Sequence, residues 1–137
     1  MRLIRAVLPN MRAKRWGRII NVASVGVKTL HLKDPMYFAN MRVEAVSITK
    51  NVAKEFGREG VTANVIATGP MLTERSKRYM EAAAARKEDE MISDTAVGRW
   101  GDPEDMGAVV AFLCSDRAGY VTGETVRVDG GYSHSLF

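Results

Sequence analysis

Three short runs of apolar and β-branched residues are separated by segments far longer than a hairpin loop. They cover residues 18–23, 61–67 and 124–128. Short apolar runs of this kind are typical of strands that are buried on both faces of a parallel sheet. A connection of a dozen or more residues joins parallel neighbours, usually through a helix. The sequence therefore predicts an α/β fold with three parallel strands.

The segments between these runs have helical spacing. A helix is predicted near residues 1–12, and another over about 36–56, where Asp34 is the N-cap, Pro35 is the first residue and Gly57 closes the helix. A third helical stretch is predicted to begin after Thr73 as its cap.

The last predicted helix repeats the cap-plus-proline pattern. Asp102 and Pro103 precede an apolar stretch that carries Cys114, the single cysteine. One cysteine forms no internal disulfide, and a free cysteine in an apolar run is expected to be a buried thiol.

Composition limits the class of protein. With 46% hydrophobic and 26% charged residues, a chain of 137 residues is expected to form one domain. No apolar run approaches the roughly 20 residues that cross a bilayer, and no leader is evident, so a soluble, cytoplasmic protein is expected. The net charge of +4 comes with no nucleic-acid-binding signature, and we predict no nucleic-acid or membrane partner.

Four motifs together resemble the short-chain dehydrogenase/reductase family. They are Asn-Val-Ala-Ser at 21–24, Tyr37 thirteen residues after Ser24, Tyr-Val-Thr-Gly at 120–123 and Val-Asp-Gly-Gly at 128–131. The similarity covers essentially the whole chain. It implies a partial Rossmann-like, doubly wound parallel sheet, consisting of the last three strands with their flanking helices. Residues 1–137 would be the C-terminal part of a single NAD(P)-binding oxidoreductase domain.

The resemblance implies hydride transfer between NAD or NADP and a small ketone or alcohol. In that family a serine, here Ser24, hydrogen-bonds the substrate oxygen, and a tyrosine, here Tyr37, exchanges a proton with it. A phenol with a pKa near 10 needs a nearby cation to act as a base, and the family places a lysine four residues on. Position 41 is methionine, and Arg42 follows it.

Two alignments of the second helix remain open. Five residues turn a helix by about 500°, so Tyr37 and Arg42 diverge unless a one-residue bulge intervenes. Counting back from Thr49 instead places Arg42 at the lysine position and Phe38 at the tyrosine position.

The turn after the second strand is the expected cofactor contact. It reads Thr-Gly-Pro-Met-Leu-Thr over 68–73. By resemblance, Thr68, Gly69, Met71 and Thr73 join Tyr37 as cofactor-binding candidates, while a capping threonine is the competing interpretation of Thr73. His31 and His134 have no partner at ligand spacing, so no metal site is predicted.

The glycine-rich turn that binds a pyrophosphate is not found in the sequence. We therefore expect a truncated chain, inactive alone, with one open edge on its sheet. The alternative is a non-catalytic oligomerisation or binding module. In either case a homo-oligomer is expected through the helices near 1–12 and 36–56, and neither the substrate nor the choice of NAD or NADP is predicted.

Overall fold

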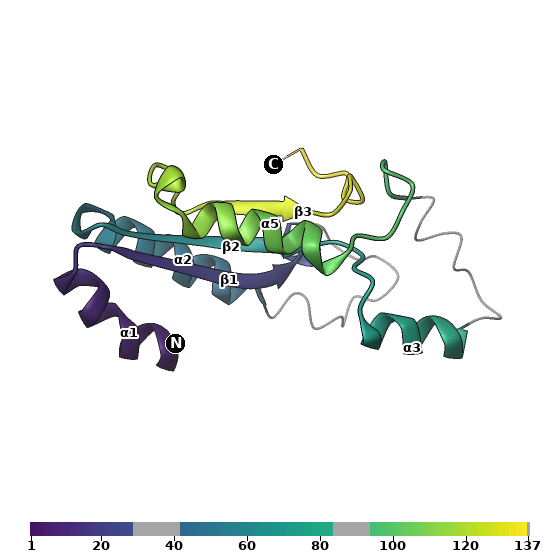
Figure 1. Ribbon diagram of the computed structural model, residues 1–137, viewed down its shortest axis with the longest axis horizontal. Helices are drawn as coiled ribbons and strands as arrows, with labels where there is room; N and C mark the ends of the chain where they lie inside the picture. The colour runs from purple at the N-terminus through teal and green to yellow at the C-terminus, as the bar shows by residue number, and fades with distance from the viewer. Residues whose placement is uncertain (29–41, 84–93, 137) are drawn as a thin grey trace.

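The computed structural model describes residues 1–28, 42–83 and 94–136. Figure 1 shows its elements in chain order: α1 (Arg2–Ala13), β1 (Gly17–Ser24), η1 (Val25–Val27), α2 (Val43–Phe56), η3 (Gly57–Glu59), β2 (Val61–Thr68), α3 (Glu74–Ala83), α5 (Pro103–Cys114), η4 (Asp116–Ala118) and β3 (Thr125–Val128).

The three strands form one parallel sheet in the order β1-β2-β3. The β1–β2 ladder is in register from Gly17 opposite Val61 to Ser24 opposite Thr68. Every residue of the central strand β2 except Thr68 is buried. The prediction of three parallel strands is confirmed.

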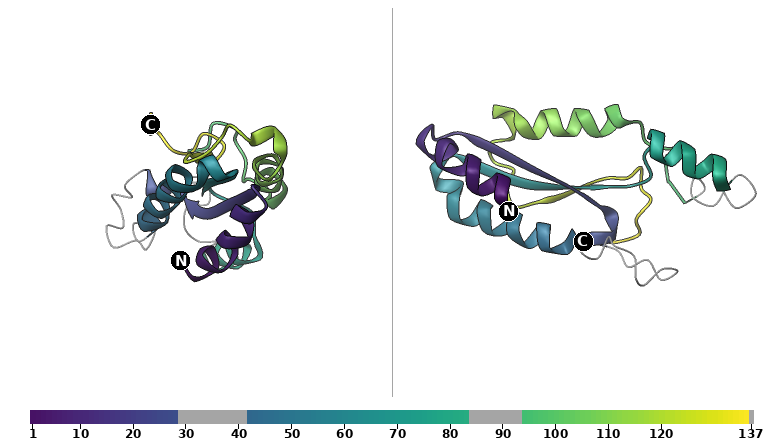
Figure 2. Two further views of the ribbon diagram at one scale, coloured as in Figure 1. Left: turned by 90° about the vertical axis from the view of Figure 1, so that its left-hand side faces the viewer. Right: turned by 90° about the horizontal axis from the view of Figure 1, so that it is seen from below.

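Helices cover both faces of the sheet (Figure 2, right). On one face α1 and α2 pack over a core that contains Ile19, Val52 and Val61. On the other face α5 packs its Leu113 against Ile66 of β2. Because successive side chains of a strand point to opposite faces, a strand covered on both faces needs apolar residues at consecutive positions. This explains the unbroken apolar runs and confirms the α/β layer structure.

The end of α2 corrects one prediction. The helix ends at Phe56 as expected, but Gly57 keeps helical angles and begins the short η3 turn. The residue in the left-handed conformation is Gly60, with φ of 84°. The described part of the helix begins at Val43 with Arg42 as N-cap, and the start predicted near Met36 lies outside the described residues.

Two of the three predicted N-caps, Thr73 and Asp102, are confirmed, and the third, Asp34, lies outside the described residues. Thr73 Oγ1 accepts a hydrogen bond from the Ser76 amide at 3.2 Å, and Ser76 Oγ accepts one from the Thr73 amide at 2.7 Å. At α5, the Asp102 amide donates to Asp105 Oδ2 at 2.9 Å. These contacts satisfy amide groups that a helix leaves free at its N-terminus.

Cys114 is half-buried, so the prediction of a buried thiol is wrong. The preceding residue, Leu113, takes the core position at 2% exposure. One residue further along a helix rotates the side chain by about 100°, which turns Cys114 away from the centre of that core.

Two asparagine side chains, the half-buried Asn21 and the buried Asn64, fix how the elements dock. Asn21 Nδ2 donates to Thr49 Oγ1 at 2.6 Å and thereby joins β1 to α2. Asn64, fully buried in β2, donates to the carbonyl of Val121 at 2.9 Å and accepts from the amide of Glu124 at 3.1 Å. The Tyr-Val-Thr-Gly segment is therefore held against the central strand by Asn64.

No helix in the described part of the chain is long and apolar enough to span a membrane.

Candidate functional site

The carboxyl ends of the three strands meet at one edge of the sheet. Ser24 lies opposite Thr68, and Thr68 lies opposite Val128. In open parallel sheets, ligands bind outside the carboxyl ends of the strands. This edge, where Ser24, Thr68 and Val128 lie side by side, is therefore the candidate site.

Ser24 is the last residue of β1 and the N-cap of the short η1 turn. Its Oγ accepts a hydrogen bond from the Gly26 amide at 3.3 Å. A serine hydroxyl has one donor and two acceptor positions. Ser24 therefore caps a turn, and its hydroxyl proton has no acceptor among the described residues.

Thr68, a predicted cofactor contact, uses its hydroxyl within the sheet. Its Oγ1 donates to the carbonyl of Ala23 at 3.0 Å, across from β2 to β1. The bond fixes the backbone directly before Ser24. This cross-strand bond has no local signal in the sequence, because the two residues are 45 positions apart.

Gly69, also a predicted cofactor contact, lies against the segment that follows β3. A Cβ at this position would lie 2.5 Å from the Cα of Asp129, so no larger residue fits without a shift. The Gly69 amide donates to the carbonyl of Val128 at 3.0 Å. The close approach that the glycine permits is thus to the segment after β3.

Met71 and Thr73 complete the predicted turn. Met71 forms an isolated parallel bridge with Gly101, and the Leu72 amide donates to the Gly101 carbonyl at 2.7 Å. Thr73 uses its hydroxyl oxygen for the α3 cap. The hydroxyls of Thr68 and Thr73 are therefore both engaged within the chain.

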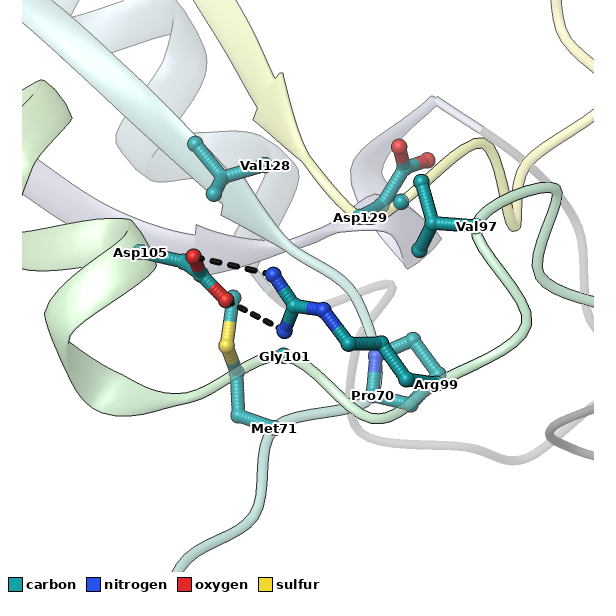
Figure 3. A pocket seen from close by; sticks show the side chains of 9 residues that line it. Pro70, Met71, Val97, Arg99, Gly101, Asp105, Val128 and Asp129 are labelled. Atoms are coloured by element: carbon teal, nitrogen blue, oxygen red, sulfur yellow. Dashed lines mark hydrogen bonds and ion pairs between the residues drawn. The ribbon is translucent and has the colours of Figure 1, made fainter.

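A pocket of about 210 Å³ opens beside this turn (Figure 3). Two of its lining residues, Arg99 and Asp105, form a bidentate ion pair. Arg99 Nη1 donates to Asp105 Oδ2 at 2.7 Å, and Arg99 Nη2 donates to Asp105 Oδ1 at 3.1 Å. The hydrogen bond with Asp105 raises the pKa of Arg99, and the same bond lowers the pKa of Asp105. The lining is formed by Pro70, Met71, Val97, Arg99, Gly101, Asp105, Val128, Asp129 and Gly130.

Asp129 organises the segment that follows β3. Its carboxylate accepts hydrogen bonds from the Ser133 hydroxyl at 2.5 Å, the Ser133 amide at 3.1 Å and the Gly131 amide at 3.0 Å. Burial acts to raise the pKa of Asp129, but these hydrogen bonds and the charge of Arg127 outweigh it, so the pKa is lowered from its ordinary value of 3.8.

This lowered pKa gives a pH prediction. A carboxylate with a depressed pKa in the folded state stabilises the fold fully above its unfolded pKa, and that stability is lost as the pH falls toward the folded pKa. Ser133→Ala removes one of these hydrogen bonds. In this variant we expect the pKa of the Asp129 carboxyl to move back toward the ordinary value. Carbon NMR of the Asp129 carboxyl measures that pKa directly.

A matched Ser47→Ala variant is the control, because Ser47 is exposed on α2. An unchanged Asp129 titration in Ser133→Ala would contradict the assignment.

The remaining candidates precede α2 in the sequence. Arg42 is exposed and lies two helical turns before Thr49, the residue that anchors α2 to Asn21. Residues about seven apart lie on nearly the same face of a helix. Tyr37, Phe38 and Met41 lie outside the described residues.

Ser24 and the turn after β2 lie at the sheet edge where a dinucleotide cofactor would bind. Ser24 offers a hydroxyl at the strand edge, but the N-termini of α3 and α5 are closed by their own caps. A pyrophosphate usually binds at an open, glycine-rich helix N-terminus. Within the described ranges no cluster of His, Cys, Asp or Glu residues is suited to a metal ion. His134 is exposed, and His31 lies outside the described residues.

Fold and site together define an α/β chain of Rossmann type whose candidate chemistry lies at the carboxyl edge of a parallel sheet. A family model described as enoyl-(acyl carrier protein) reductase matches residues 1–133. The chain belongs to the short-chain dehydrogenase/reductase family.

Individual relatives support this family assignment. The chain is 39% identical over 130 residues to a 3-oxoacyl-(acyl-carrier-protein) reductase of Vibrio cholerae, covering 95% of this chain and 51% of the relative. A gluconate 5-dehydrogenase of Burkholderia cenocepacia, solved with NADP and tartrate, superposes with a TM-score of 0.84 at 30% identity, covering 97% of this chain and 51% of that one.

A third similar protein is a putative 2-deoxy-D-gluconate 3-dehydrogenase of Agrobacterium tumefaciens with bound NADP. It has a TM-score of 0.82 at 31% identity, over 93% of this chain and 51% of that one. The chain spans about half the length of each of these relatives.

Proposed function

We propose that residues 1–137 form the C-terminal part of a single Rossmann-type domain that transfers a hydride between a nicotinamide cofactor and a small ketone or alcohol. Family membership supports an NAD(P)-dependent oxidoreductase. NADP is the proposed cofactor because two similar solved proteins carry it. The names of the relatives differ in substrate, so the proposal goes no further than the ketone or alcohol class.

The observation that carries this proposal is the position of Ser24. Its hydroxyl lies at the carboxyl edge of the sheet and donates to no acceptor in the part of the chain that the structure describes, while the Thr68 bond to Ala23 fixes the backbone beside it. A donor held in place before the reaction stabilises the negative charge that develops on a carbonyl oxygen during reduction.

Proton transfer is assigned to Tyr37, with Arg42 as the cation that favours its phenolate. A guanidinium is always protonated, so it stabilises the phenolate by charge and relays no proton. The cofactor, when bound, supplies or accepts the hydride. Thr68, Gly69, Met71 and Thr73 would border its nicotinamide end, mainly through backbone groups because both threonine hydroxyls are engaged.

The activity is tested on a chimera in which the unmatched half of the Vibrio cholerae reductase is joined to this chain. We expect NADPH-dependent ketone reduction by the chimera and none by the 137-residue polypeptide alone. Ser24→Ala should lower kcat/KM by at least about 100-fold, because it removes the hydrogen bond to the developing oxyanion.

Ser47→Ala, on the exposed side of α2, should leave the rate unchanged. Tyr37→Phe and Phe38→Tyr separate the two alignments of the helix. Loss of activity in the first variant supports Tyr37 as the proton donor, and activity gained in the second assigns that role to position 38. Turnover by the isolated chain that disappears on Ser24→Ala would contradict the proposed inactivity.

Assembly and cellular location remain predictions. Leu3 and Val7 on α1 are 81% and 41% exposed, which favours helix α1 as part of a homo-oligomer contact. Sedimentation of the chain measures that state. A cytoplasmic location is untested.

A further inference from the structure

Three backbone segments meet around the pocket at the carboxyl edge of the sheet (Figure 3). They are the turn 68–72 at the end of β2, the loop 95–101 before α5, and the segment 128–133, which begins with the last residue of β3. All three contribute to the pocket lining, together with Asp105 of α5. The turn is the one that the proposed function places at the nicotinamide end of the cofactor. A residue that holds this turn in place therefore also determines where the cofactor lies.

The turn is held from two sides by backbone hydrogen bonds. On one side the Gly69 amide donates to the carbonyl of Val128 at 3.0 Å. On the other side the Gly101 amide donates to the carbonyl of Pro70 at 3.0 Å, and the Gly101 carbonyl accepts from the amide of Leu72 at 2.7 Å. The position of the turn therefore depends on the two segments beside it.

The 128–133 segment also holds the 95–101 loop. The Gly130 carbonyl accepts a hydrogen bond from the amide of Val97 at 3.1 Å. Gly130 and Gly131 both have positive φ, and a Cβ on either one would lie 2.6 Å from the side chain of Val97 or Ala96 respectively. Because the 128–133 segment bonds both the turn and the loop, it is the common support of the pocket wall.

The Asp129 carboxylate fixes the shape of the 128–133 segment. Its Oδ1 accepts from the Gly131 amide, and its Oδ2 accepts from both the amide and the hydroxyl of Ser133. Hydrogen bonds to an ionised carboxylate are roughly twice as strong as those between neutral groups. The backbone of Asp129 lies directly against the turn, because a Cβ on Gly69 would be 2.5 Å from the Asp129 Cα. Asp129 thus joins the shape of this segment to the position of the turn.

We propose that Asp129 is a positioning residue for cofactor binding: it holds the 128–133 segment against Gly69 and so sets the place of the turn that borders the nicotinamide. All three of these carboxylate hydrogen bonds stay within the segment, so Asp129 acts on the turn through the backbone. The inference rests on the proposed function, which assigns the turn to the cofactor. Ser24 is on β1, two strands away from β3, so loss of Asp129 should weaken cofactor binding and change the chemical step little.

The first measurement uses the 137-residue chain and needs no cofactor. In Asp129→Ala we expect amide hydrogen exchange at Gly69 and Val97 to become at least about tenfold faster, because both amides donate to the segment that has lost its carboxylate. The Val65 amide donates to the carbonyl of Glu124, before β3 begins, at 2.8 Å. Its exchange rate should stay the same, which shows that the sheet remains folded.

The second measurement uses the chimera described above. Asp129→Ala should raise both the Kd for NADPH, measured by fluorescence titration, and the KM for NADPH about tenfold, while kcat stays within about twofold. General loss of folded enzyme would lower kcat and leave KM unchanged, so this split identifies positioning. Asp129→Asn keeps one acceptor oxygen and should give intermediate values. The matched control is Asp94→Ala, which removes the same charge at an exposed position and should change neither constant.

Unchanged exchange at Gly69 in Asp129→Ala would overturn the proposal. If that variant does not fold, Ser133→Ala decides, because it removes one of the three hydrogen bonds: faster exchange at Gly69 supports the proposal and an unchanged rate overturns it. An active chimera whose affinity for NADPH is the same with and without Asp129 sinks only this inference. A parent chimera that neither binds NADPH nor reduces a ketone sinks the proposed function, while faster exchange at Gly69 still supports Asp129 as the residue that holds the turn.

Discussion

Replacing Asn64 with leucine is expected to lower the free energy of unfolding by about 3 kcal/mol. The side chain is fully buried and makes two hydrogen bonds, to the carbonyl of Val121 and from the amide of Glu124. Leucine has a similar size and makes neither bond. Each buried backbone group that loses its partner costs roughly 1–3 kcal/mol, and water does not reach this site to replace the amide.

Urea denaturation followed by circular dichroism measures the change as a lower midpoint at an unchanged slope. The control is Asn51→Leu, the same substitution at an exposed position of α2, which should stay within about 0.5 kcal/mol of the parent chain. Equal stability of the two variants would show that Asn64 does not hold the segment before β3.

The elements that the sequence predicted correctly are those with a strong local signal. The apolar runs of β1 and β2 and the caps at Thr73 and Asp102 all depend on residues close together in the chain. The long separation between the apolar runs of β1 and β2 also predicted that the two strands pair in parallel, because no hairpin joins strands so far apart in the chain.

The contacts that were missed join residues far apart in sequence. Asn21 meets Thr49 at a separation of 28 residues, and Asn64 meets Val121 at 57. An asparagine within an apolar run signals a buried amide, but nothing local identifies its partner. The same limit applies to Thr68, whose hydroxyl bonds Ala23 at a separation of 45 residues.

Glycines illustrate a different limit. Gly57 and Gly60 are three residues apart, and either one satisfies a pattern in which glycine closes a helix. Which glycine takes the left-handed conformation depends on the η3 turn. This turn continues the helical path from Gly57 to Glu59, and the left-handed residue is Gly60 after it. The left-handed φ of Gly60 and its close approach to the Arg15 carbonyl make Gly60 the indispensable glycine.

Gly60→Ala is accordingly expected to destabilise the chain by about 3 kcal/mol. With φ of 84°, an added Cβ is strained in the backbone, at roughly 1–2 kcal/mol. It would also lie 1.9 Å from the carbonyl oxygen of Arg15, so the backbone has to move, which adds about 1–3 kcal/mol.

The movement affects the start of the sheet. The Gly60 carbonyl accepts from the Gly17 amide at 3.1 Å, and the next residue, Val61, pairs with Gly17 in the β1–β2 ladder. Gly57→Ala is the matched control, because Gly57 has helical angles and nothing within 4 Å of an added Cβ. Alanine there should stabilise the chain by about 0.5–1 kcal/mol through helix propensity. Thermal and urea unfolding should thus shift in opposite directions for the two variants, and a shared direction would contradict the role assigned to Gly60.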